Sequence, residues 1–310
     1  MRRPQTLPRR LGEAFTTRAA AAAGVGRSRR DARDLARPFH GTRARSAPST
    51  FEEFIDSYKT IMLPAQMFVG RTAMRLWGLP HPEPWNTSEP LHVCVMPDAA
   101  PPRGAGVKGR RLAPHRVQRL IFRGAPVVDP IAAVLTSAPD LTLVQTVTAF
   151  DALLASADNY PGIHAARPMA TREEVQRRID EWGRFTGCAT IRTALRLARE
   201  GVESPKESET RLLIMAGGLP EPVVQWEVFD GMRLVARVDL AYPELKIAIE
   251  YDGDGHRTDK EQWRSDIRRQ RELERMGWIV IHLTQADLED PAAFLMHLSR
   301  AHSARLTAGA

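Results

Sequence analysis

The chain has 310 residues, with 44 Lys and Arg, 37 Asp and Glu, nine His and two Cys, and its formal net charge is +7. Its 43% hydrophobic and 26% charged residues are typical of an ordinary globular protein, and they exclude a disordered, collagen-like or coiled-coil chain. Cys94 and Cys188 form neither a disulfide framework nor a cysteine-based zinc site, and no apolar run is long enough to span a membrane. We therefore expect roughly two or three domains, a reducing, cytoplasmic location and no membrane partner.

The positive charge is concentrated in two stretches. Residues 1–45 contain twelve Arg and three acidic residues, and residues 99–128 contain seven Lys and Arg and no acidic residue. A Lys or Arg that neutralises a phosphate releases counterions and so adds affinity for nucleic acid. Charge alone leaves nucleic-acid binding and a solvated basic surface equally open.

Residues 1–45 have the pattern of two short helices joined by a turn. The alanine-rich run 16–23 predicts a helix, Gly24-Val25-Gly26 breaks it, and Ser28 can cap a second helix that runs to about Leu35. Residues 39–42 then predict a short wing. We expect a winged helix-turn-helix whose second helix presents three arginines to nucleic acid; a plain helical cap is the alternative. These arginines are Arg29, Arg30 and Arg33.

Residues 46–200 predict a middle α/β region in which helices and strands are mixed. Apolar spacing predicts helices over 51–62, 66–77, 129–137, 142–156, 171–184 and 188–200. Alternation predicts strands over 91–96, 107–112 and 119–122. The aromatic and aliphatic residues of these segments are expected to form a core.

Residues 204–300 predict a third domain with a different order of elements. Helices are expected over 205–216 and 259–276, and strands over 223–229, 233–240, 246–251 and 278–283. The order is α-β-β-β-α-β, and its last three elements predict a parallel strand pair with helices on both sides of a mixed sheet. The whole chain is therefore expected to be of the α+β class.

The predicted strands of this domain bring acidic residues together. In a hairpin centred near residues 244 and 245, Asp239 and Glu250 face each other, and Asp252 lies on the same face as Glu250. Neighbouring carboxylates repel unless they share a proton or a cation, and their oxygen atoms suit Mg²⁺ or Mn²⁺. The alternative is a solvent-exposed acidic turn. His256, four residues after Asp252, is a candidate general acid or base.

The predicted helix 259–276 carries a basic stripe. At 100° per residue its five cations fall within an arc of about 80°, which fits contact with a phosphodiester backbone beside a metal site. Interleaved acidic residues leave a salt-bridged, solvated face as the alternative. The stripe consists of Lys260, Arg264, Arg268, Arg271 and Arg275.

Several of these motifs occur in the order found in a known family. They are Ser204-Pro205-x-Glu207, Arg237-Val238-Asp239, Glu250-Tyr251-Asp252-Gly253, His256 and Trp263-x-x-Asp266, followed by Gly277-Trp278. Residues 204–291 thereby resemble the domain-of-unknown-function 559 group, which belongs with the Vsr-type very-short-patch-repair endonucleases of the PD-(D/E)XK superfamily. Phe15-Thr16-Thr17, Trp77-Gly78-Leu79-Pro80 and residues 91–95 resemble the AbiEi-type antitoxin arrangement.

The resemblance implies a restriction-endonuclease-like core in which Asp239 and Glu250 hold Mg²⁺ and Glu207 is an outer catalytic carboxylate. The superfamily pattern ends in Lys two positions after the second acid, whereas this chain has Asp252. Vsr-type enzymes also lack that Lys and use His chemistry, for which His256 is the candidate.

The function expected from these features is Mg²⁺-dependent hydrolysis of phosphodiester bonds in DNA. The principal alternative is a non-catalytic, DNA-binding regulator of antitoxin type that keeps a nuclease-like scaffold. A structural or protein-interaction module without a nucleic-acid role is the third possibility.

Overall fold

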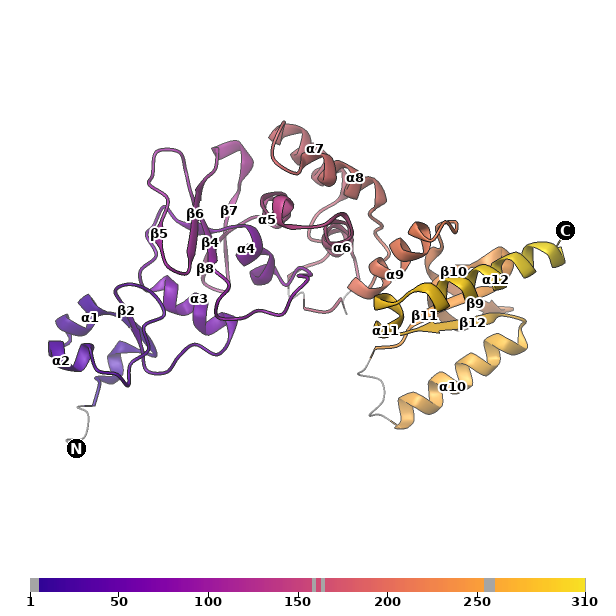
Figure 1. Cartoon of the computed structure of the whole chain (residues 1–310), viewed down its shortest axis with the longest axis horizontal. Helices are drawn as coiled ribbons and strands as arrows, with labels where there is room; N and C mark the ends of the chain where they lie inside the picture. The colour runs from indigo at the N-terminus through magenta and orange to yellow at the C-terminus, as the bar shows by residue number, and fades with distance from the viewer. Residues whose placement is uncertain (1–5, 158–159, 163–164, 254–259, 310) are drawn as a thin grey trace. The chain divides into compact units, whose positions relative to one another are not determined.

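The computed structural model of the chain describes residues 6–157, 160–162, 165–253 and 260–309 (Figure 1). Two compact units are present: Met1–Asp140 with Arg177–Cys188, and Leu141–Gln176 with Ala189–Ala310. Each unit combines helices with a mixed sheet, so the predicted α+β class is confirmed. Residues of the predicted middle region are found in both units, and the proposed division into 1–45, 46–200 and 204–300 stays a prediction. Among the described residues, no helix is long and apolar enough to cross a membrane.

The beginning of the chain forms two short helices framed by a two-stranded sheet. The 3-10 turn η1 (Arg9–Leu11) leads to β1 (Ala14–Thr16), α1 (Thr17–Ala22), α2 (Arg27–Arg30) and β2 (Thr42–Ala44). β1 and β2 pair antiparallel. The Thr16 hydroxyl caps α1 by accepting a hydrogen bond from the Ala19 N–H at 2.9 Å.

The second helix is shorter than predicted. The prediction that it runs to Leu35 is wrong, because α2 ends at Arg30. Leu35 is 5% exposed and packs with Phe15 and Ala20, which requires the chain to turn back before it. Ala36 then bridges to Ala44, so the segment after α2 is held by tertiary contacts.

A six-stranded mixed sheet forms the core of the first unit. Its order is β5-β6-β4-β3-β8-β7, and the pairs β4–β6 and β3–β8 are parallel. The strands are β3 (Met67–Phe68), β4 (Leu91–Val95), β5 (Arg103–Gly104), β6 (Val107–Arg111), β7 (Arg119–Phe122) and β8 (Ala125–Val128). The helices and turns of this region are α3 (Phe51–Lys59), α4 (Gly70–Trp77), η2 (Pro114–Arg116), α5 (Pro130–Ser137) and η3 (Ala138–Asp140).

The helix predicted over 66–77 begins late. Met67 and Phe68 pair with β4 and β8 in the middle of the sheet, so α4 starts only at Gly70. Gly70 has a φ of +57°, and a Cβ at this position would lie 2.8 Å from the His92 ring. Sheet pairing therefore overrides the local helical pattern at this point.

Three helices connect this region to the last third of the chain. They are α6 (Leu143–Leu154), α7 (Arg172–Trp182) and α8 (Cys188–Leu197). All three were predicted within a few residues of these bounds. α6 belongs to the second unit.

The second unit contains the predicted order of helix, three strands, helix and strand. The elements are α9 (Pro205–Ala216), β9 (Val223–Asp230), β10 (Arg233–Tyr242), η4 (Pro243–Leu245), β11 (Ile247–Tyr251), α10 (Lys260–Arg275) and β12 (Ile279–Leu283). The sheet order is β12-β11-β10-β9, with β11 and β12 parallel and the other pairs antiparallel. Two further helices, α11 (Gln285–Glu289) and α12 (Ala292–Gly309), were not predicted.

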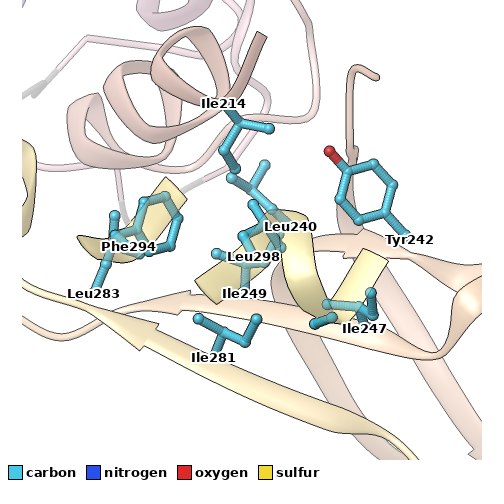
Figure 2. Packing of buried hydrophobic residues seen from close by; sticks show 10 residues of the cluster. Ile214, Leu240, Tyr242, Ile247, Ile249, Ile281, Leu283, Phe294 and Leu298 are labelled. Carbon is cyan, nitrogen blue, oxygen red and sulfur yellow. The ribbon is translucent and has the colours of Figure 1, made fainter. Parts of the chain in front are cut away.

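Helices cover both faces of this sheet, as predicted. On one face, Ile214 of α9 and Phe294 and Leu298 of α12 pack against β10, β11 and β12 (Figure 2). On the other face, Leu273 of α10 packs against the side that includes Ala248. Figure 1 shows α10 across the sheet from α9 and α12. Because successive residues of β11 alternate between the faces, Glu250 lies on the α10 side.

Candidate functional site

Two carboxylates face each other where β10 and β11 pair. The register joins Ala241 to Ala248 and Leu240 to Ile249, so the next opposed residues are Asp239 and Glu250. The Tyr251 N–H donates to Asp239 Oδ2 at 3.0 Å. The arrangement is the one expected from the sequence.

Both carboxylates are held in a poorly solvated place. Glu250 is only 8% exposed. Burial raises the pKa of Glu250, and the negative charge of Asp239 raises it further, against the nearby positive charge of Arg269. Burial likewise raises the pKa of Asp239, and Glu203 and Asp252 add to this effect. Such a pair favours the presence of a proton or a cation.

Glu207 adds a third carboxylate to this place, and it is buried. It lies in the first turn of α9, whose N-terminus is capped by Ser204, and it is 5% exposed. Its Oε2 accepts hydrogen bonds from the Glu203 N–H and from Gln225 Nε2, both at 2.9 Å. Burial, and then the charge of Asp239, raise the pKa of Glu207 to about 7. The structure thus brings Glu207 within electrostatic reach of Asp239.

A cation from the next helix contacts Glu250. Arg269 of α10 donates from Nη2 to Glu250 Oε2 at 2.9 Å, and the same nitrogen is 3.7 Å from Asp266 Oδ1. The other oxygen, Glu250 Oε1, is buried and has no hydrogen-bond partner among the described residues. Arg269 is not among the site residues predicted from the sequence. The available signal was its position four residues before the buried Leu273, which places both side chains on the sheet side of the helix.

Asp252 and His282 form a second polar pair beside the carboxylates. His282 Nδ1 is 3.0 Å from Asp252 Oδ1, and the Asp252 side chain is 56% exposed. His282 lies on β12 in register with Glu250. His282 is not among the site residues predicted from the sequence, although the ends of parallel strands meet at one edge of a sheet. His256, the histidine selected from the sequence, lies outside the described residues.

The carboxylates fit only a particular kind of metal site. In the described part of the chain, no group of three or more His, Cys, Asp or Glu side chains is arranged to hold a metal ion. Mg²⁺, however, usually binds through one or two carboxylates and completes its shell with water and substrate phosphate. Asp239 and Glu250 fit such a site, and Glu250 Oε1 is an oxygen atom without another partner among the described residues.

The basic stripe of α10 is described in part. Arg268 and Arg271 are exposed. Arg275 is also exposed, although its guanidinium lies 3.5 Å from Glu272. Lys260 and Arg264 lie on the first part of α10, where side chains are outside the described part. The exposed arginines therefore lie on the helix that also supplies Arg269.

The arginines of the N-terminal segment differ in their accessibility. Arg29 forms an ion pair with Asp34 at 2.8 Å, and its side chain is 11% exposed. Arg30 donates to the Thr17 carbonyl oxygen at 3.2 Å. Arg33 is exposed. Two of the three thus stabilise the local turn, and Arg33 is the most accessible to a partner.

Two curated proteins and one solved structure are similar to parts of this chain. No protein-family profile matches the chain. "Uncharacterized protein MT2308" and "Uncharacterized protein Rv2248", from two strains of Mycobacterium tuberculosis, are each 29% identical over 138 residues, which is 43% of this chain. The chain spans about half the length of these curated relatives, 51% of each. The crystal structure of the RV2827C protein from Mycobacterium tuberculosis is similar over 70% of this chain and 84% of that chain, with a TM-score of 0.37 and 16% identity.

Proposed function

We propose that this protein is a metal-dependent DNA endonuclease whose C-terminal unit is a restriction-endonuclease-like core. The observation that carries the proposal is an opposed pair of carboxylates, the half-buried Asp239 and the buried Glu250, on a mixed sheet with the helix and strand order α9-β9-β10-β11-α10-β12. Their pKa values are raised by burial, which is the electrostatic condition that favours a bound cation. The proposed cation is Mg²⁺ or Mn²⁺.

The residues of the chain have separate roles in this proposal. Asp239 and Glu250 would hold the metal, which supplies an activated water and stabilises the departing oxygen when bound. Glu207, with a pKa near 7, is able to keep or release a proton beside Asp239. Arg268 and Arg271 would contact the DNA backbone next to the site. The N-terminal segment, as a winged helix-turn-helix, would add a second DNA contact through Arg33.

A second candidate is a non-catalytic, DNA-binding regulator that keeps the nuclease-like scaffold. Two observations favour it. Arg269 already neutralises part of the charge of Glu250, and Asp252 stands where the superfamily pattern has Lys. A protein of this kind would bind DNA through its arginines and leave the phosphodiester bonds intact.

Cleavage assays separate the two candidates. Purified protein is incubated with plasmid and with mismatched duplexes in Mg²⁺, in Mn²⁺ and in EDTA, beside Asp239→Ala and Glu250→Ala. We expect metal-dependent nicking that both substitutions abolish. Glu244→Ala is the matched control, because Glu244 is an exposed carboxylate in the turn between the same two strands.

The other outcomes are equally informative. Salt-sensitive binding without cleavage in any metal supports the regulator. Cleavage that persists in both variants contradicts the metal site. A protein that neither binds nor cleaves DNA contradicts both candidates and leaves the structural or protein-interaction module.

A further inference from the structure

Arg269 places a positive charge on one of the two carboxylates of the proposed metal site. We propose that Arg269 is a built-in counter-ion of Glu250 and that it competes with the divalent cation for this carboxylate. The inference rests on the metal site proposed above, and it concerns how that site is regulated. Metal binding would be coupled to the position of an α10 side chain.

The contact between Arg269 and Glu250 is of a strong kind. Arginine stays charged at all relevant pH values, and its bond to a carboxylate is charge-assisted. The distance from Arg269 Nη2 to Glu250 Oε2 is 2.9 Å. Since Glu250 is buried beside Asp239, removal of the guanidinium would leave a poorly solvated carboxylate without its counter-charge.

The exposures of the two side chains indicate which of them can move. The side chain of Arg269 is 37% exposed, whereas that of Glu250 is 11% exposed. Arg269 also has a second acidic neighbour on its own helix, because its Nη2 is 3.7 Å from Asp266 Oδ1. The arginine is therefore able to leave Glu250 for solvent while staying close to an opposite charge.

A divalent cation and Arg269 oppose each other at this carboxylate. A cation held by Asp239 and Glu250 would need the Glu250 carboxylate, whose Oε1 has no hydrogen-bond partner among the described residues. The cation and the Arg269 guanidinium would then share one carboxylate, in a place where charges are weakly screened. Each positive charge thus lowers the affinity of Glu250 for the other.

The test measures metal affinity directly. Mn²⁺ binding to the full chain is followed by isothermal titration calorimetry in wild type, Arg269→Gln, Arg269→Lys and Arg268→Gln. We expect Arg269→Gln to bind Mn²⁺ about tenfold more tightly or better, because a competing charge next to the ligand is gone. Arg268→Gln removes the same charge from an exposed neighbouring position and should change the affinity by less than about twofold. Arg269→Lys, which keeps the charge, should stay closer to wild type.

Thermal unfolding supplies a second readout. Without metal, Arg269→Gln should melt at a lower temperature than wild type, because Glu250 loses its counter-ion. Saturating Mn²⁺ should raise the melting temperature of Arg269→Gln by more than it raises that of wild type. In the calorimetric titration, the double variant Arg269→Gln with Glu250→Gln should lose the tighter Mn²⁺ binding that Arg269→Gln alone is expected to have.

The outcomes distinguish this inference from the proposed function. Equal or weaker Mn²⁺ binding in Arg269→Gln, or an equal gain in Arg268→Gln, overturns the counter-ion role and leaves the nuclease proposal standing. Tighter binding in Arg269→Gln together with no DNA cleavage supports the counter-ion role and contradicts the nuclease. Absence of Mn²⁺ binding in every variant overturns both.

Discussion

Three carboxylates of the second unit differ in their burial and in the groups that contact them. Glu207 is buried and bonded to Gln225, Glu250 is buried and paired with Arg269, and the side chain of Asp252 is 56% exposed beside His282. Burial penalises the charged form, whereas a nearby cation favours it. The groups that bond to Glu207 Oε2 are the uncharged Glu203 N–H and Gln225 amide, and burial raises the pKa of Glu207 to about 7.

The raised pKa of Glu207 predicts a dependence of stability on pH. Between its ordinary value of 4.5 and about 7, the folded state holds more protons at this site than the unfolded state does. This stabilising contribution is therefore complete below pH 4.5 and is lost as the pH rises through 7. The loss is about 3 kcal/mol at most.

Glu207→Gln cannot ionise and should remove this part of the pH dependence. In urea denaturation without metal, we expect the variant and wild type to be similar near pH 4.5, and the variant to have the larger free energy of unfolding near pH 8. Some slope will remain, since burial also raises the pKa values of Asp239 and Glu250. Glu244→Gln, at an exposed position, is the control. If the free energy of unfolding changes equally with pH in wild type and Glu207→Gln, the raised pKa of Glu207 is contradicted.

At the scale of the element, α10 connects the sheet to the proposed DNA surface. Leu273 packs against the sheet, and Arg269 reaches Glu250. Arg268 and Arg271 are exposed to solvent. One helix thus combines a buried apolar contact, an arginine that pairs with Glu250 and arginines that are exposed to solvent.

The exposed arginines of α10 predict a change in the salt dependence of DNA binding. Each lost phosphate contact lowers the slope of log affinity against log salt by about 0.9, so Arg268→Ala with Arg271→Ala should lower it by about 1.8. Fluorescence anisotropy over a range of salt concentrations measures this slope. Arg300→Ala is the control, because Arg300 is an exposed residue of α12, on the other side of the sheet. If Arg300→Ala lowers this slope as much per arginine removed, the net charge of the protein decides the salt dependence and the position of the arginines does not.

At the scale of the whole molecule, a buried polar network makes α6 part of the second unit. Asp151 of α6 and Arg211 of α9 are both 0% exposed and form an ion pair at 3.1 Å. Asp151 also accepts hydrogen bonds from the Ser208 hydroxyl and the Arg199 N–H, both at 2.7 Å. Arg211 reaches Glu221 at 2.7 Å. This network joins α6 to the helix that carries Glu207.

Breaking this ion pair should be costly. Asp151→Ala leaves the buried Arg211 without one of its two carboxylates, and we expect the free energy of unfolding to fall by about 3 to 5 kcal/mol. Chemical denaturation measures the loss. Asp151→Leu combined with Arg211→Met should recover much of it, because an apolar pair of similar volume avoids the desolvation of charge. Asp140→Ala, at an exposed position, is expected to have little effect, and a loss as large as that of Asp151→Ala would contradict the prediction.

Local pattern was sufficient for most of the elements and for the opposed acids. Helical spacing and strand alternation depend on neighbours in the chain, and Asp239 faces Glu250 because a short turn joins their strands. The same pattern failed where distant contacts decide the conformation. Met67 and Phe68 became a central strand, and the second N-terminal helix stopped at Arg30 to bury Leu35.

Only the tertiary structure revealed which charges meet. Arg269 reaches Glu250 across 19 positions of sequence, His282 reaches Asp252 across 30, and Arg211 reaches Asp151 across 60. No local periodicity encodes such pairs, because they depend on how strands and helices pack against one another. The acidic site was therefore visible in the sequence, whereas the cation that balances it was not.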